Sequence, residues 1–214
     1  MSHRICENIK QIEQEVENVH LVVVSKYRSL PELEEVYACG HRNFGENRVQ
    51  ETLDKYEKLP KDINWHIIGH LQTNKVKYIA PFVHLIHSVD SLKLLQTIDK
   101  EAQKNNRIIP FLFQLHIAQE ETKFGLSAEE LEDILQSDDF KTLENVKSQG
   151  LMGMASLTDS AYQIKKEFNS LLMLYTKHKA LYNWDTLSMG MSSDYKLAVE
   201  CGSTMIRVGS KVFQ

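Results

Sequence analysis

A chain of 214 residues with 42% hydrophobic content can bury a substantial core, as one domain or at most two small ones. Its formal net charge of −4 argues against a nucleic-acid-binding surface, which is normally basic. The sequence has no apolar run long enough to span a membrane.

The cysteines and the N-terminal residues indicate a cytoplasmic protein. Cys6, Cys39 and Cys201 are odd in number and widely separated, so they suggest neither a metal-binding spacing nor a disulfide framework. The first residues also lack the apolar segment of a signal peptide. We therefore expect a soluble protein that works in the reducing cytoplasm.

Helical and strand patterns alternate from the start of the chain. Apolar residues at steps of three and four predict an amphipathic N-terminal helix: Ile5, Ile9, Ile12, Val16 and Val19. Residues 21–25 then run without alternation, with four apolar residues before Ser25, as in a strand that is buried on both faces. A second helix is predicted to begin at Pro31 and to stop at Gly40.

Seven further strands are predicted, each before a helical or capping pattern, at residues 42–45, 64–69, 83–87, 109–115, 151–154, 186–189 and 204–208. Ser91 and Ser127 are placed to cap two of the helices between them. Eight strand-helix units without a linker predict one domain over residues 1–214, an α/β (β/α)8 barrel with an extra N-terminal helix. A doubly wound open sheet is the alternative, because periodicity does not show closure.

The last two strands each end in small, hydrogen-bonding residues. Gly190, Ser192 and Ser193 allow a close turn, and Asp194 or Ser193 can cap a helix over residues 195–201. Free backbone N–H groups at such a helix start attract anions. The first of these segments therefore predicts a phosphate site.

Gly209 and Ser210 repeat this arrangement after the last strand, with Arg207 one step inside it. In a (β/α)8 barrel the active site lies at the C-terminal ends of the strands, and the loops after strands seven and eight often bind phosphate. Barrel closure would also bring Lys26, at the end of the first strand, beside the last strand. A lysine, an arginine and a phosphate cradle are thus expected at one mouth.

A lysine in that place can pair with phosphate, act as a base or form an imine with a carbonyl. Burial of Lys26 between strands would lower its pKa toward the range that imine formation needs. Pyridoxal 5′-phosphate (PLP) carries both an aldehyde and a phosphate, and so matches both parts of the site. The simpler alternative is a solvated lysine at the end of a strand.

Several further segments are distinctive: VVSK at 23–26, FGENRVQE at 44–51, WHIIGHLQTNK at 65–75, KFGL at 123–126, GLM at 150–152 and the C-terminal run. Together they resemble one family, the pyridoxal phosphate homeostasis proteins, which are single-domain relatives of the alanine racemase N-terminal barrel. The segments occur in order over nearly the whole chain. The resemblance implies a PLP-binding barrel of fold type III.

The resemblance also implies roles for individual residues. Lys26 resembles the lysine that forms the internal aldimine, and Arg207 resembles the residue that faces the pyridine nitrogen. Asn47 resembles a cofactor-pocket residue from the loop after the second strand. The implied phosphate ligands are Ser192, Ser193, Gly209 and Ser210.

The function implied is PLP binding and intracellular PLP homeostasis, by buffering the cofactor or delivering it to apo enzymes, in a monomeric protein without catalytic residues. A guanidinium only donates hydrogen bonds, so Arg207 would keep the pyridine nitrogen of PLP unprotonated. An unprotonated pyridine ring is a weaker electron sink for carbanion intermediates. Alanine racemases add a C-terminal β-domain with a catalytic tyrosine, whereas this sequence stops at Gln214. The alternatives are a PLP-dependent amino-acid racemase with restricted activity, and a phosphosugar-binding barrel without a covalent link.

The histidines do not predict a metal site. His66 and His70 straddle a strand end rather than share a helical face, and His84 and His87 lie on opposite faces of a strand. We expect them to pack in the barrel or its loops. The fifth strand, around His116, departs from the family pattern, so no contact is assigned there.

Overall fold

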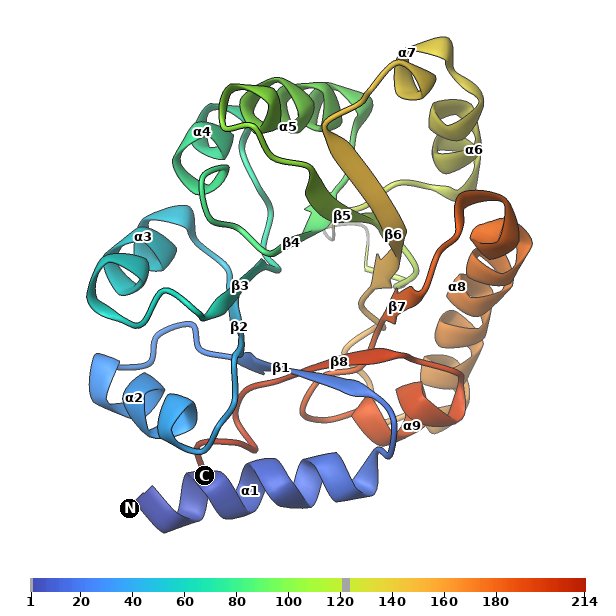
Figure 1. Ribbon diagram of the computed structural model, residues 1–214. Helices are drawn as coiled ribbons and strands as arrows, with labels where there is room; N and C mark the ends of the chain where they lie inside the picture. Colours follow the sequence, from blue (N-terminus) through green and yellow to red (C-terminus); the bar gives the residue numbers. More distant parts are fainter. Residues whose placement is uncertain (1, 121–123) are drawn as a thin grey trace.

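Eight parallel strands form a closed barrel in the computed structural model, which describes residues 2–120 and 124–214 (Figure 1). Each strand pairs with the next in the chain, and β1 pairs with β8 to close the sheet. The strands are β1 (His20–Val24), β2 (Asn43–Glu46), β3 (Asn64–Ile67), β4 (Leu85–Val89), β5 (Ile109–Leu115), β6 (Val146–Gly153), β7 (Thr186–Ser188) and β8 (Met205–Val208). The predicted barrel is confirmed, and the open-sheet alternative is wrong.

The helices surround the barrel, and the predicted extra helix is present at the N-terminus (Figure 1). They are α1 (Ser2–Glu15), α2 (Leu30–Ala38), α3 (Val49–Lys58), the 3-10 helix η1 (Thr73–Lys75), α4 (Val76–Ile79), α5 (Leu92–Lys104), α6 (Ala128–Gln136), α7 (Asp138–Lys141), α8 (Ala161–Tyr182) and α9 (Tyr195–Glu200). Both predicted caps are confirmed. The Ser91 hydroxyl accepts from the Leu94 N–H at 3.3 Å, and Ser127 accepts from the Glu130 N–H at 3.1 Å. None of the helices in the described ranges is long and apolar enough to cross a bilayer.

Some element bounds differ from the predicted ones. β4 begins at Leu85 rather than at 83, because the Val83 N–H still donates to the Ile79 carbonyl at the end of α4. β6 begins at Val146 rather than at 151, since its backbone pairs with β5 although several of its side chains are polar. The short helix α7 was not predicted. Lys123, in the 123–126 segment, lies outside the described residues.

Inside the barrel, apolar side chains fill one level and polar side chains another. The apolar cluster contains Val22, Leu85, Leu112, Met152 and Met205, which come from five different strands. Two larger apolar clusters lie between the strands and the surrounding helices. The barrel is therefore a packed core, and its open, polar surface is at the strand ends.

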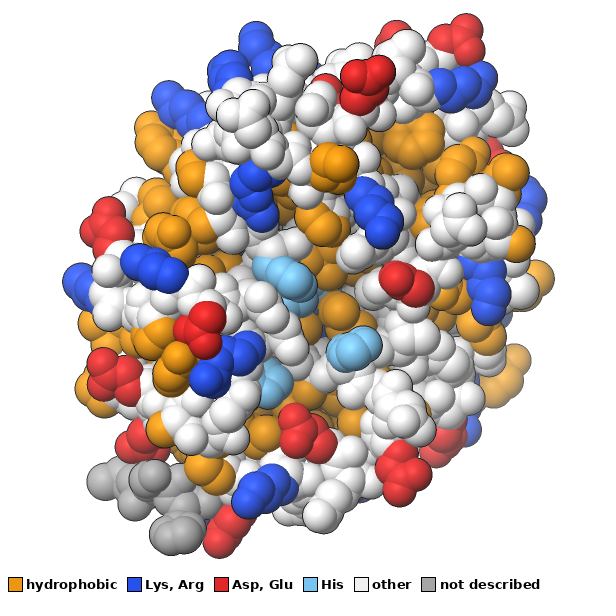
Figure 2. Space-filling view, in the orientation of Figure 1, with side chains coloured by type: hydrophobic (Ala, Val, Ile, Leu, Met, Phe, Trp, Pro, Cys, Tyr) orange, Lys and Arg blue, Asp and Glu red, His pale blue; other side chains and the backbone are white. Residues whose placement is uncertain are grey.

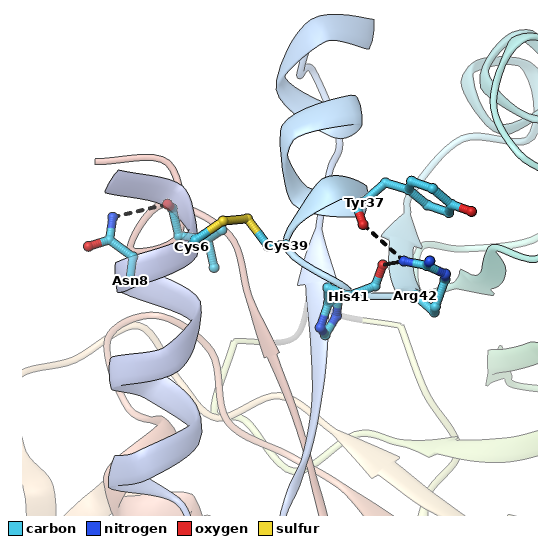
Figure 3. The surroundings of a disulfide bond; sticks show 7 residues. Cys6, Asn8, Tyr37, Cys39, His41 and Arg42 are labelled. Carbon is cyan, nitrogen blue, oxygen red and sulfur yellow. Dashed lines mark hydrogen bonds between the residues drawn. A yellow bond between two sulfur atoms is a disulfide. The ribbon is translucent and has the colours of Figure 1, made fainter. Parts of the chain in front are cut away.

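A disulfide joins Cys6 of α1 to Cys39 at the end of α2 (Figure 3). The expectation that the cysteines form no disulfide was therefore wrong. The two residues are 33 apart in sequence, but α1 packs beside α2 and brings their Cα atoms to 5.4 Å, within the range that a disulfide bridges. Only Cys201 is a free thiol in the described part of the chain. The inference of a reducing compartment loses the support that it drew from Cys6 and Cys39.

Reduction of this disulfide should lower the free energy of unfolding by about 3 kcal/mol, because the bond removes conformational freedom from a long loop of the unfolded chain. Urea unfolding of the oxidised protein, the reduced protein and the Cys6→Ala/Cys39→Ala variant measures the effect. The reduced protein and the double variant should have the same midpoint, below that of the oxidised protein. Coincident curves for all three would show that the bond does not stabilise the fold.

Candidate cofactor site

The C-terminal ends of β1 and β8 meet at one mouth of the barrel. Val23 pairs with Val208, so the residues that follow on each strand are neighbours. A Cβ on Gly209 would lie only 3.2 Å from the Cβ and the carbonyl oxygen of Val24, which shows how closely the two strand ends pack. Closure therefore brings the end of β1, two residues before Lys26, into contact with Gly209.

Lys26 occupies a turn directly after β1, between the buried Ser25 and the exposed Tyr27. Tyr27 has a φ of 62°, so the backbone reverses there. Lys26 itself is exposed, in contrast to the burial expected from the sequence, because the chain has already left the strand at Val24. Its amine is consequently accessible to a ligand that enters from the solvent.

The two small-residue loops are joined to each other. The Gly209 N–H donates to the Ser192 hydroxyl at 3.2 Å. Gly190 has a φ of +99°, and a Cβ there would lie 2.6 Å from the Cβ of Ala198. This position therefore needs glycine for both its backbone angle and its packing.

Asp194 closes the loop after β7. It lies at the N-cap position of α9, but its carboxylate makes no capping bond to that helix. It accepts instead from the Met191 N–H at 2.6 Å. Ser193 and Ser210 are exposed, one in each loop, so their hydroxyl groups are open to a ligand at the mouth.

Arg207 is buried inside the barrel, below the two loops. Its Nη1 donates to the Ser188 hydroxyl at 2.5 Å, and its Nη2 donates to the Gly153 carbonyl at 3.1 Å. Burial lowers the pKa of Arg207 to about 10, and Asp194 opposes the shift. The guanidinium therefore stays protonated at neutral pH and offers only donors.

Asn47 follows β2 at the same mouth and is half-buried. Its carbonyl oxygen would lie 2.5 Å from a Cβ on Gly69, so the loops after β2 and β3 are in close contact. A cavity of about 330 Å³ opens beside it, lined also by His70, Gln72 and Lys75. Asn47 is thus placed on the wall of a cavity between the loops that follow β2 and β3.

Two polar side chains at the end of β5 bond to the backbone that follows the strand. The Gln114 Nε2 donates to the Phe124 carbonyl at 2.9 Å, and the His116 Nε2 donates to the Glu120 carbonyl at the same distance. The divergent segment around His116 therefore contacts its own chain after β5 in the described residues.

A buried ion pair behind Lys26 was missed in the sequence. The Lys55 Nζ on α3 lies 2.7 Å from the Glu46 Oε1 at the end of β2 and donates to the Ser25 carbonyl at 2.8 Å. The Ser25 hydroxyl also donates to the Glu46 Oε1. Burial raises the pKa of Glu46, and Lys55 and Ser25 oppose the shift. In the sequence, Glu46 stands out only as part of the 44–51 segment. Its spacing from Lys55 gives no sign that the two side chains pair.

The groups at the mouth fit PLP. An accessible primary amine follows β1, the end of β1 packs against Gly209 in two joined loops of hydroxyl and backbone N–H groups, and a buried guanidinium precedes Gly209 on β8. These are partners for an aldehyde, a phosphate and a ring nitrogen, respectively. Within the described ranges, no group of three or more His, Cys, Asp or Glu side chains could hold a metal ion.

The fold and the mouth define a barrel of the alanine racemase N-terminal class, and the profile described as "Alanine racemase, N-terminal domain" matches residues 2–214. The pyridoxal phosphate homeostasis protein of Aquifex aeolicus is 42% identical over 186 residues, which cover 85% of this chain and 80% of that protein. The Synechocystis protein of the same name is 38% identical over 200 residues, covering 92% and 91%. This chain belongs to the pyridoxal phosphate homeostasis protein family.

Solved structures agree with this assignment. The PipY protein of Synechococcus elongatus with PLP bound is 33% identical and has a TM-score of 0.89, with 98% of this chain and all of that chain covered. The alanine racemase of Bartonella henselae has a TM-score of 0.78 at 16% identity, with 99% of this chain and 58% of that chain covered. The racemase thus shares the barrel fold.

Proposed function

We propose that this protein binds PLP at Lys26 and serves intracellular PLP homeostasis in the cytoplasm, by buffering the cofactor or by delivering it to apo PLP-dependent enzymes. The observation that carries the proposal is the convergence of the accessible Lys26 amine, the joined Ser192 and Gly209 loops and the buried Arg207 guanidinium on one mouth. The PLP-bound structure of the related PipY protein supports it. We propose that the protein acts as a monomer.

Each group at the mouth has a role in this proposal. Bound PLP supplies an aldehyde, and the Lys26 amine is the group that would hold it. The Arg207 guanidinium would donate to the ring nitrogen, and Asn47 would line the pocket on the β2 side. The phosphate would be held by the hydroxyl and backbone N–H groups of Ser192, Ser193, Gly209 and Ser210.

The donor character of Arg207 favours binding over catalysis. Although burial lowers the pKa of Arg207 to about 10, the guanidinium is protonated at neutral pH and gives the ring nitrogen a donor without transferring its proton. The ring is then a weaker electron sink than a pyridinium. The alternative is amino-acid racemisation, because a lysine beside the same cofactor can also move a substrate α-proton.

One experiment separates the two functions. The PLP-loaded protein is incubated with an apo PLP-dependent enzyme, and separately with L-alanine and other L-amino acids in deuterated water. Binding and delivery predict recovery of the acceptor enzyme's activity with no α-deuterium incorporation. Rapid α-deuterium incorporation with formation of the D-amino acid would instead establish a racemase. A protein that fails to bind PLP would contradict both.

The phosphate contacts can be tested through ligand choice. Ser192→Ala should weaken PLP binding about tenfold, because a hydrogen bond to a charged group is lost, and it should leave the binding of pyridoxal unchanged. Ser170→Ala, on the outer helix α8, is the matched control. Fluorescence titration with both ligands gives the comparison. Equal weakening of PLP and pyridoxal would place the phosphate elsewhere.

A further inference from the structure

A line of polar side chains crosses the barrel interior below the mouth. His66 of β3, His87 of β4, Ser188 of β7 and Arg207 of β8 are all buried. The His66 Nδ1 lies 2.9 Å from the His87 Nε2, and the His87 Nδ1 lies 3.2 Å from the Ser188 Oγ. Since β4 and β7 are not neighbours in the sheet, the contact between His87 and Ser188 spans the interior itself.

Donor and acceptor chemistry allows one continuous direction along this line. Arg207 can only donate, so the Ser188 oxygen accepts from it at 2.5 Å. With His87 as the Nε2–H tautomer, the Ser188 O–H donates to the His87 Nδ1. The His87 Nε2–H then donates to the His66 Nδ1. The His66 Nε2–H in turn points to the Asn43 Oδ1 at 3.4 Å. Every member donates to the next, starting from the arginine.

This arrangement requires both imidazoles to be neutral, and their surroundings keep them so. Burial lowers the pKa of His66 to about 3, and the nearby His84 adds to the shift. Burial also lowers the pKa of His87 well below its ordinary value, with His66 and Arg207 contributing. A protonated imidazole would have donors on both nitrogens and would break the line.

The line ends at the opposite, N-terminal mouth of the barrel. Asn43 accepts there from the Asn64 Nδ2 at 3.1 Å as well. A cavity of about 360 Å³ opens at this end and is lined in part by His20, His66 and His84. Figure 2 shows histidine side chains around a hollow in the middle of the barrel. The end of the line is therefore next to solvent, while its other members are enclosed.

We propose that His87 and Ser188 are positioning residues that hold the Arg207 guanidinium for the ring nitrogen of the bound cofactor, an inference that rests on the proposed function. The Ser188 hydroxyl donates its proton to His87, and this orients its oxygen to accept from Arg207. The Gly153 carbonyl holds the other terminal nitrogen, so the guanidinium is fixed between β6 and β7. The N–H groups that these two bonds do not use are then available to the cofactor.

The test compares PLP with 1-deazapyridoxal 5′-phosphate, in which a C–H group replaces the ring nitrogen. Wild-type protein should bind PLP about tenfold more tightly than the deaza analogue, since only PLP can accept from Arg207. His87→Phe removes the acceptor for the Ser188 proton, and it should reduce this preference severalfold while leaving the deaza analogue's affinity unchanged. His87→Gln should restore part of the preference. The matched control is His84→Phe, which should keep the full preference.

Several results would overturn the proposal. Wild-type protein without any preference would show that Arg207 does not meet the ring nitrogen, and an undiminished preference in His87→Phe would show that His87 does not position Arg207. Wild-type protein that does not bind PLP at all would instead refute the proposed function.

A second measurement does not depend on the cofactor or on the variants. Nitrogen-15 NMR of the wild-type apo protein reports which imidazole nitrogen carries the proton. His66 and His87 should both be neutral Nε2–H tautomers from pH 6 to pH 8. An Nδ1–H tautomer at His87 would reverse the direction of the line and contradict the proposal even where His87→Phe fails to fold.

Discussion

Replacing Lys26 with alanine should abolish covalent retention of PLP. The amine of Lys26 is exposed at the mouth, next to the ends of β1 and β8, and alanine offers no nucleophile in its place. The phosphate loops and Arg207 are unchanged, so the variant should still bind PLP weakly and reversibly. The absorption spectrum of the dialysed protein and its intact mass after borohydride treatment measure the loss.

Lys75→Ala is the matched control, because Lys75 is another exposed lysine and lines the cavity beside Asn47. This variant should retain PLP as the wild type does. The attachment site would not be Lys26 if Lys26→Ala retained PLP as the wild type does. The same conclusion would follow if Lys75→Ala lost as much PLP as Lys26→Ala.

Replacing Lys55 with methionine should lower the free energy of unfolding by about 4 kcal/mol, since it leaves the buried Glu46 carboxylate without its ionic partner. Glu46 is fully buried, and its Oε2 has no hydrogen-bond partner within the described residues, so the Ser25 hydroxyl on Oε1 is left to compensate for the loss. The Ser25 carbonyl, directly before Lys26, loses its bond to α3 at the same time. Urea unfolding of both proteins measures the change.

Lys58→Met on the same helix is the control, and it should change the stability by less than about 0.5 kcal/mol because Lys58 is exposed. The double variant Glu46→Leu/Lys55→Met should recover much of the loss, because it leaves no uncompensated buried charge. A small effect of Lys55→Met alone would show that the ion pair does not hold the end of β1.

The sequence predicts the barrel well because each strand has a local signal. Residues 109–115 form β5 with the predicted bounds, since this mostly apolar segment is buried at every position except the half-buried Pro110. β6 is different, because Lys147 and Ser148 are polar and enter the strand through backbone pairing with β5. The first part of β6 therefore leaves no apolar pattern of its own, whereas residues 151–153 do.

The candidate site likewise has features that the sequence predicts and contacts that it does not predict. The small residues after β7 and β8 and the lysine after β1 are visible along the chain, and closure of the sheet brings them together. The Cys6–Cys39 bond depends on how α1 packs against α2, and the Glu46–Lys55 pair depends on how α3 packs against β2. The His87–Ser188 contact joins residues 101 apart in sequence. Such pairs arise from tertiary packing, which spacing does not encode.

The central claim is that Lys26 is the residue that holds PLP. The most direct measurement is peptide mass mapping of wild-type protein that has been loaded with one equivalent of PLP, reduced with borohydride and digested. The account predicts that the added mass is found on the peptide containing Lys26. Modification spread over other lysines, or located at a different single lysine, would contradict it.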